Sequence, residues 1–286
     1  MKADLECLSC LMKQALNSVN IATDDPLLKR EVLDRVSAII PEADLNRTPA
    51  EISKPVYRIV SEITGNADPY KKAREETNRE ALGLLPLLEE KLRRSASPLQ
   101  TALHMAVAGN IVDIGIGHAF DLQKDVLALL DVPFADDDSD SFAGELIAGR
   151  NLLYLGDNSG EIVFDRLLVK TLLSYGIKVT YTVKSGPIIN DALMEDAQTA
   201  GITALVPVLE TGADDIGINL DHCSPAFRKA LADADVIIAK GHGNFETCSD
   251  LPYNFYFLLK AKCAVVAREL GVTLGDIVFK KTTARS

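Results

Sequence analysis

The segment Asn151–Asp165, NLLYLGDNSGEIVFD, constrains the fold of this chain more than any other stretch. Its first five residues form a short apolar run typical of a buried strand, and the apolar spacing after Glu161 is typical of a helix. The letters DNSG between them make a tight polar turn. We therefore expect a strand, a turn and a helix of a parallel sheet. The turn would lie at the carboxyl end of the strand, where open α/β sheets bind ligands.

This turn also carries the chemistry of a metal and anion site. The N–H groups at the start of the following helix favour an anion such as phosphate. The side-chain oxygens of Asp157 and Asn158 suit a hard divalent cation. An ordinary turn in which Asp or Asn caps the helix would use the same residues, so the segment alone leaves both interpretations open.

The hydrophobic pattern changes along the chain. Up to about residue 130 it has helical spacing throughout, with prolines in the first turns of helices and no credible strand. Later, short apolar runs alternate with helices, which indicates a mostly parallel sheet with helices on both faces. We predict an α/β fold with an all-helical N-terminal domain, residues 1–145, and a Rossmann-like domain, residues 146–286.

The same pattern predicts individual elements. The acidic run at 136–140 is expected to be a solvated loop between the two domains, and residues 255–261 are expected to be helical. The expected strands are 151–155, 177–183, 204–208, 235–239 and 263–267, with an edge strand at 273–279.

Three polar loops follow expected strands and would meet at the carboxyl edge of a parallel sheet. They span residues 156–160, 184–191 and 240–246. Together they bring two carboxylates, two amides and two lysines to a helix N-terminus, which is the inventory for a divalent metal with a phosphate ester. These side chains are Asp157, Asp191, Asn158, Asn244, Lys184 and Lys240.

Composition narrows the class of protein. The 286 residues carry a formal net charge of −11, and nucleic-acid binding requires a basic surface, so we expect no nucleic-acid partner. No apolar run approaches the roughly 20 residues that a membrane span needs. The first residues, MKADLECLSC, do not form a signal peptide. Five cysteines, an odd number, favour reduced thiols, and we predict a cytoplasmic location.

Cys7 and Cys10 are spaced CxxC on an expected helix, so their sulfurs can share one face. Such a pair is half of a metal site, and the distant candidates for further ligands are Cys223, Cys248, Cys263 and the histidines. Cys7, Cys10 and Cys263 could form a second metal site, with structural zinc or iron, away from the cleft. Two small residues at a helix contact, or redox chemistry, remain open as alternatives.

Asn110 and Asp113 interrupt an otherwise apolar segment, AVAGNIVDIGIG. Polar groups in such a segment must find partners or face a cavity. They are either a buried hydrogen-bonding pair or an amide and a carboxylate that this helix lends to a site beneath it.

Four motifs carry a resemblance to a known family. They are CLSC from Cys7, GNIVD from Gly109, GDNSGEIVFD from Gly156 and KGHGNFE from Lys240. With them the chain resembles the metal-dependent damage-control phosphatases, formerly the domain-of-unknown-function 89 family, and most of all their prokaryotic, cysteine-bearing branch. The similarity covers essentially the whole chain, and the second pair of motifs in that order is specific.

The resemblance implies hydrolysis of phosphate monoesters. The metal, which could be magnesium, manganese, cobalt or nickel, is expected on Asp157, Asn158 and Asp191, and Lys240 is expected to contact the substrate phosphate. The implied substrate is a small phosphorylated sugar or a damaged phosphometabolite. Many members have Gln where this chain has His242, which leaves the role of His242 open. The other expected substrate-binding residues are Asn110, Asp113, Ser159, Gly160, Glu161, Lys184, Asn244 and Glu246.

Other functions fit parts of the pattern. A haloacid-dehalogenase-like phosphotransferase needs an Asp two residues after its nucleophile, and position 159 is Ser. A methyltransferase could hold its nucleoside cofactor in the glycine-bearing loop after the first strand. A non-enzymatic metal- or redox-sensing protein could be centred on Cys7, Cys10 and Cys263.

Overall fold

The computed structural model describes residues 1–109 and 122–282 of the chain. In this part, seven strands form one sheet in the spatial order β1-β7-β6-β5-β2-β3-β4. All neighbouring strands are parallel except β6 and β7. This confirms the predicted α/β fold with a mostly parallel sheet. The strands are β1 (Asp136–Asp137), β2 (Asn151–Leu155), β3 (Lys178–Val183), β4 (Val208–Glu210), β5 (Val236–Lys240), β6 (Phe255–Lys260) and β7 (Ile277–Thr282).

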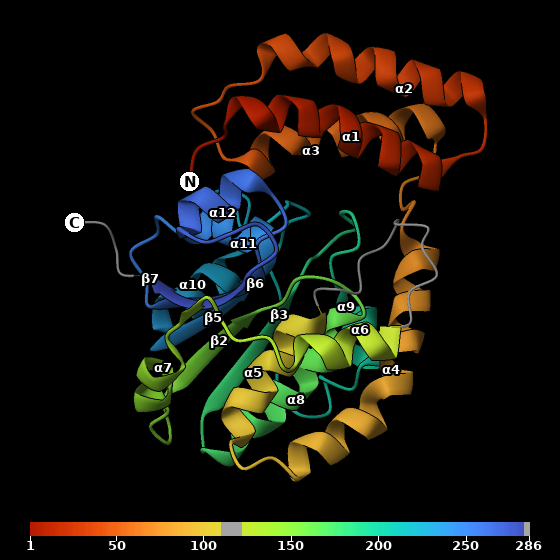
Figure 1. Ribbon diagram of the computed structural model, residues 1–286. Coiled ribbons are helices and arrows are strands. Elements are labelled where there is room, and N and C mark those ends of the chain that lie inside the picture. The colour runs from red at the N-terminus through yellow and green to blue at the C-terminus, as the bar shows by residue number, and fades with distance from the viewer. Residues whose placement is uncertain (110–121, 283–286) are drawn as a thin grey trace.

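Helices cover both faces of this sheet and extend beyond it (Figure 1). Several of these helices begin at a residue that the sequence pattern marks as a helix start. Thr48 accepts the N–H of Glu51, whose carboxylate accepts the N–H of Thr48 in return. The helices are α1 (Leu5–Ala22), α2 (Pro26–Ile39), the short 3₁₀ helix η1 (Ile40–Glu42), α3 (Pro49–Thr64), α4 (Lys71–Arg93), α5 (Pro98–Ala108), α6 (Leu122–Leu129), α7 (Ser139–Glu145), α8 (Glu161–Ser174), α9 (Met194–Thr199), α10 (Pro225–Asp233), α11 (Gly241–Cys248) and α12 (Ala264–Leu270).

The two faces of the sheet belong to two separate core clusters. In β2, Leu152 and Tyr154 pack with α4, α5 and α8, whereas Leu153 and Leu155 pack with α10, α11 and α12. This alternation follows from the opposite directions of successive side chains in a strand. Helices α1, α2 and α3 have a third cluster of their own and lie together near α11 and α12 (Figure 1).

Two elements near the C-terminal end exchange their expected types. Phe255–Lys260 is the strand β6, not a helix, and residues 264–270 are the helix α12, not a strand. The β6 run is apolar because its side chains enter both core clusters. A short apolar run with no period cannot be told from a buried helix by pattern alone. The strand expected at 204–208 also lies later in the chain than predicted, and is β4, Val208–Glu210.

The acidic run is likewise not a solvated loop between domains. Asp136 lies in β1, beside β7, and forms a 2.6 Å ion pair with Lys280. Asp138 accepts the backbone N–H of Lys281 at 2.7 Å. These partners come from the other end of the chain, so no local pattern could reveal them.

Helices α4 and α5 share a core cluster with the sheet, and α4 packs against both α8 and α9. The division of the chain near residue 145 stays a prediction. Among the described residues, no helix combines the length and the apolar character that crossing a membrane requires.

Candidate metal and substrate site

Two loops pair at the carboxyl edge of the sheet and bring the expected metal ligands together. Asn158 and Asp191 form an isolated antiparallel bridge, and the N–H of Ala192 donates to the carbonyl of Asp157 at 2.8 Å. Ile189, in the second loop, has a φ of 47°. Residues in such strained conformations cluster at functional sites. The pairing places Asp157, Asn158 and Asp191 side by side, although the sequence separates them into two loops.

A glycine makes room for the first of these carboxylates. The carboxylate of Asp157 lies against Gly241, the first residue of α11, where a Cβ would come within 1.9 Å of Oδ2. Gly241 also has a φ of 75°, which disfavours other residues. The first glycine of the KGHGN motif, Gly241, therefore leaves the space that the carboxylate of Asp157 occupies.

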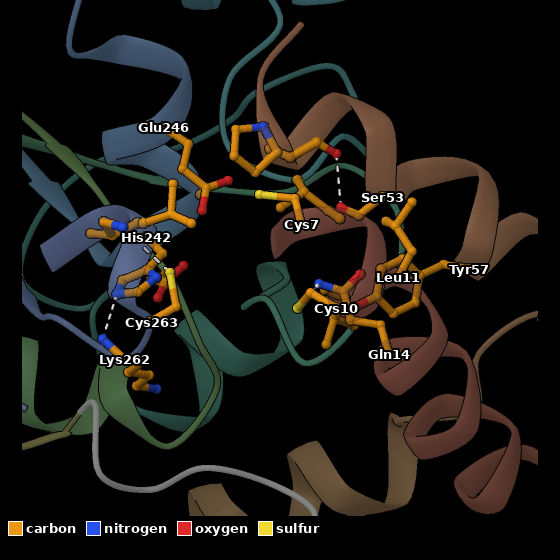
Figure 2. Close-up of a pocket in the computed structure, with 18 of the residues that line it drawn as sticks. Cys7, Cys10, Leu11, Gln14, Ser53, Tyr57, His242, Glu246, Lys262 and Cys263 are labelled. Carbon is orange, nitrogen blue, oxygen red and sulfur yellow. Dashed lines mark hydrogen bonds between the residues drawn. The ribbon is translucent and has the colours of Figure 1, made fainter. Parts of the chain in front are cut away.

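The three expected ligands line a cavity of about 480 Å³ that also reaches helices α1 and α3. Its opposite wall includes Gln14 and Tyr57, and Figure 2 shows these side chains across the cavity from Lys262. The cavity thus lies between the sheet edge and the N-terminal helices.

The lining of this cavity is acidic. It has four carboxylates, those of Glu6, Asp157, Asp191 and Glu246, and among the described lining residues Lys262 is the lysine that opposes them. Burial, together with the neighbouring charges of Glu161 and Asp191, holds the pKa of Asp157 well above its usual range. Burial also raises the pKa of Asp191 to about 6, against the opposing effect of Lys184.

These donors fit a hard divalent cation. Burial disfavours the charged forms of Asp157 and Asp191, and a nearby positive charge would stabilise those charged forms. The amide nitrogen of Asn158 donates to Asp157 at 2.9 Å, so the amide oxygen of Asn158 is directed away from this carboxylate. In the described part of the chain, no group of three or more His, Cys, Asp or Glu side chains is placed to hold a metal ion. The set expected here contains only two such side chains, and its third donor is an amide.

Two of the N–H groups expected to hold a phosphate in the turn after β2 have partners within the protein. The N–H of Ser159 donates to the carbonyl of Asn190 at 2.9 Å, and that of Gly160 donates to Oδ1 of Asn78 at 2.7 Å. Ser159 and Glu161 are fully buried. Two of the N–H groups that would hold an anion are therefore already used by the protein.

Lys240 likewise has partners other than the expected phosphate. Its ammonium group is fully buried and donates to Glu161 at 2.5 Å, to Asp165 at 2.6 Å and to the carbonyl of Ala106 at 2.9 Å. Although burial opposes the charge, Asp165 and Glu161 raise the pKa of Lys240 to about 12. All three N–H donors are occupied, so contact with a phosphate would require one of these bonds to be given up.

The remaining expected residues hold the loops in place or line the cavity. Lys184 donates to the carbonyl of Gly217 and lies 3.6 Å from Asp191. Asn244 donates to the carbonyls of Gly156 and Lys240 at 3.1 and 2.8 Å.

Glu246 and His242 line the cavity itself. Burial raises the pKa of Glu246 to about 7, against the hydrogen bond from the N–H of Ala50. Nε2 of His242 lies 2.8 Å from the carbonyl of Lys260 and 2.9 Å from the N–H of Lys262. His242 thereby fixes the loop that carries Lys262.

The cysteines expected away from the cleft lie in it. Cys7, Cys10 and Cys263 all line the same cavity as Asp157 and Asp191. The prediction of a separate position was wrong, because the fold brings α1 and the start of α12 over the carboxyl edge of the sheet. Whether the thiols bind metal stays a prediction.

Asn110 and Asp113, which were expected to bind substrate, lie outside the described residues. Two other residues, Lys262 and Asn78, were not expected from the sequence. Lys262 was missed because it follows a run that was expected to be helical. Asn78 was missed because it is one polar residue among many on α4, and only its burial, at 3% exposed, distinguishes it.

A family model and two relatives match this chain over nearly its whole length. Residues 3–278 match the family described as damage-control phosphatase ARMT1-like domain. A protein of Archaeoglobus fulgidus named damage-control phosphatase is 36% identical, with 98% of this chain and 99% of that protein covered. A protein of Pyrococcus horikoshii with the same designation is 35% identical, with 97% of each covered.

A solved structure is also similar. The crystal structure of a DUF89 family protein from Pyrococcus horikoshii superposes with a TM-score of 0.91 at 33% sequence identity. The comparison covers 99% of this chain and 100% of that one. The fold is therefore shared over essentially the whole length of both proteins.

Proposed function

The chain belongs to the damage-control phosphatase ARMT1-like family, and from this premise we propose that it is a metal-dependent hydrolase of small phosphate monoesters. One observation carries the proposal. The pairing of two loops places Asp157, Asn158 and Asp191 together on the wall of an acidic cavity. A phosphate dianion would be repelled by these carboxylates unless a cation were bound among them.

In this proposal the chain's own residues position the reacting groups. Asp157, Asn158 and Asp191 hold the cation, and Gly241 leaves the space that Asp157 needs. Neutralisation of the phosphoryl oxygens is the chemistry that a divalent cation supplies when bound. Lys262 adds positive charge at the same wall, and its charge lowers the pKa of Asp157.

Lys240 has a different proposed role from the one expected from the sequence. It holds the carboxylate of Glu161. The other oxygen of Glu161 lies 3.5 Å from the amide nitrogen of Asn158. Lys240 thus acts on the site through Glu161 and Asn158, as a positioning residue.

The cavity supports a small substrate. Its volume of about 480 Å³ lies within the range of about 300–1,000 Å³ typical of small-molecule sites. The lining includes the amides of Gln14 and Asn190 and the hydroxyl of Ser53, which can hydrogen-bond a polar leaving group. A phosphorylated sugar or a damaged phosphometabolite has this character. The cytoplasmic location stays a prediction.

The decisive experiment is a substrate panel with controlled metal content. The purified chain is treated with chelator, dialysed, and assayed for phosphate release from sugar phosphates and other small monoesters. Magnesium, manganese, cobalt and nickel are each added alone. We expect hydrolysis only with metal, and much slower hydrolysis by Asp157→Asn. Hydrolysis by the metal-free protein, or by Asp157→Asn at the parent rate, would contradict the proposal. Failure of every metal and ester would leave the non-enzymatic sensor as the better interpretation.

A further inference from the structure

Glu246 lines the cavity but has no part in the proposed hydrolysis. It lies on α11, one helical turn after His242, and Figure 2 shows its carboxylate directed into the cavity toward Cys7. The carboxylate accepts the N–H of Ala50 in the first turn of α3. A carboxylate is thus held at the cavity wall where α11 meets the N-terminal helices.

The cations around Glu246 have other anionic partners. The ammonium group of Met1 donates to the backbone carbonyl of Glu246, but its ion pair is with Asp250, at 2.9 Å. Glu6, a second carboxylate of the lining, is paired with Arg268 at 2.7 Å. Among residues 1–109 and 122–282, no side-chain cation forms an ion pair with the carboxylate of Glu246. Its raised pKa of about 7 agrees with this, because a close cation would favour the ionised form.

Two amide side chains of the lining have unpaired atoms. Oε1 of Gln14, an acceptor on α1, has no hydrogen-bond partner among the described residues, while Nε2 of Gln14 donates to Cys10 at 3.5 Å. Nδ2 of Asn190, a donor beside Asp191, is unpaired in the same part of the chain, and Asn190 is only 5% exposed. Buried polar atoms without partners are costly, and a ligand in the cavity can supply the missing partners.

The two sides of the cavity therefore suit different chemical groups. Near the loops of the sheet edge, Asn190 and Lys262 bring hydrogen-bond donors, which suit phosphoryl oxygens. Toward α1, Gln14 and Glu246 bring acceptors, which suit a group that carries several N–H donors. A substrate with its phosphate at the loops would place its other end against these acceptors.

The charge of the cavity favours the same orientation. A divalent cation would balance the carboxylates of Asp157 and Asp191. A phosphate dianion then brings more negative charge than Lys262 balances, and Glu246 adds to the excess. An ammonium group on the substrate would reduce this excess of negative charge.

We propose that Glu246, together with the amide oxygen of Gln14, binds an ammonium group on the non-phosphate part of the substrate. The substrate class is then the phosphate monoesters of amino sugars and amino alcohols. This inference rests on the proposed function, because it names the substrate class of the same cavity. Glu246 takes no part in bond cleavage and determines specificity through a charge-assisted hydrogen bond.

The first test compares esters that differ in a single group. The 6-phosphates of glucosamine and glucose form one pair, and the monophosphates of ethanolamine and ethylene glycol form another. Initial rates with Mn²⁺ near pH 7 give kcat/KM for each ester. In at least one pair we expect the amine to be preferred by about 10- to 100-fold, the effect of one hydrogen bond to a charged group. Equal values, or a preference for the hydroxyl, in both pairs would overturn the proposal.

Matched variants connect this preference to one carboxylate. Glu246→Gln keeps the shape of the side chain and removes its charge, so the preference for the amine should disappear. Glu6→Gln changes a carboxylate of the same lining that is exposed and already paired with Arg268, and it should keep the parent preference. A preference that survives Glu246→Gln, or is lost in Glu6→Gln, would contradict the role given to Glu246.

Binding of sugars without phosphate separates this inference from the proposed function. Saturation-transfer NMR on the metal-free chain detects contact with glucosamine and with glucose, and a phosphatase can hydrolyse neither. We expect a signal for glucosamine with the parent and Glu6→Gln, and none with Glu246→Gln. If this pattern holds but no ester is hydrolysed, the proposed function fails and the amine site stands. Equal signals for the two sugars would remove the amine site even from an active phosphatase.

Discussion

Asn78 donates a hydrogen bond from its side-chain amide to the carboxylate of Asp196 at 2.6 Å. Its amide oxygen accepts the N–H of Gly160 at 2.7 Å. Asp196 in turn accepts the N–H of Leu193 at 2.8 Å. Gly160 follows Asn158 closely, and Leu193 follows Asp191 closely. One buried amide on α4 therefore connects, through hydrogen bonds, the turn that carries Asn158 to the segment that follows Asp191.

This connection predicts a rescue by exchange of the two side chains. Asn78→Asp places two carboxylates against each other, and we expect metal affinity to fall by about 10–100-fold, the usual cost of losing a supporting contact. Asn78→Asp combined with Asp196→Asn restores a donor opposite an acceptor and should recover most of the affinity. Calorimetric titration of the metal-free proteins with Mn²⁺ measures both effects. Equal affinities for the parent and Asn78→Asp would show that the connection does not matter.

Two glycines with nearly the same φ offer a second test. Gly241 and Gly271 have φ values of 75° and 76°, but only at Gly241 would a Cβ meet the carboxylate of Asp157. Alanine at either position should lower stability, because a side chain disfavours this conformation by roughly 1–2 kcal/mol. Only Gly241→Ala should also weaken Mn²⁺ binding. Chemical denaturation and metal titration on both variants separate the two effects, and equal Mn²⁺ affinities would contradict the role given to Gly241.

The sequence predicted the parts of this site that local order determines. The turn after β2, the loops after β3 and β5 and the parallel sheet all follow from residues that are neighbours in sequence. What it missed depends on distant packing. Phe255–Lys260 was expected to be a helix because its burial on both faces removes the alternation that marks a strand. The available N–H groups expected at Ser159 and Gly160 were lost to Asn78 and Asn190, which no turn pattern could show.

Lys240 should contribute more to the free energy of unfolding than a lysine that only contacts a phosphate would. Lys240→Met leaves the buried carboxylates of Glu161 and Asp165 without their cation, and breaking a buried pair in this way costs about 3–5 kcal/mol. Adding Glu161→Gln and Asp165→Asn to Lys240→Met removes the unpaired charges and should restore part of the loss. Urea denaturation curves of the three proteins test this. A Lys240→Met protein as stable as the parent would refute the role given to Lys240 here.

Metal should stabilise the fold if it binds to the native loops alone. A ligand at about 100 times its Kd adds about 2.7 kcal/mol to the free energy of unfolding. We expect Mn²⁺ to raise the midpoint of thermal unfolding of the parent and of Asp214→Asn, an exposed aspartate in another loop. Asp191→Asn should show little or no rise. The same rise in Asp191→Asn would place the stabilising ion elsewhere.

The cavity walls also have a consequence for biosynthesis. The wall on α1 and α3 is made early, whereas Lys262 and Cys263 leave the ribosome only after nearly all of the sheet strands. Chains begin to fold as they emerge, and α1–α3 have a core cluster of their own. These helices must therefore wait until α12 docks before the cavity has both of its walls. The cavity therefore has both of its walls only after nearly all of the chain has been synthesised.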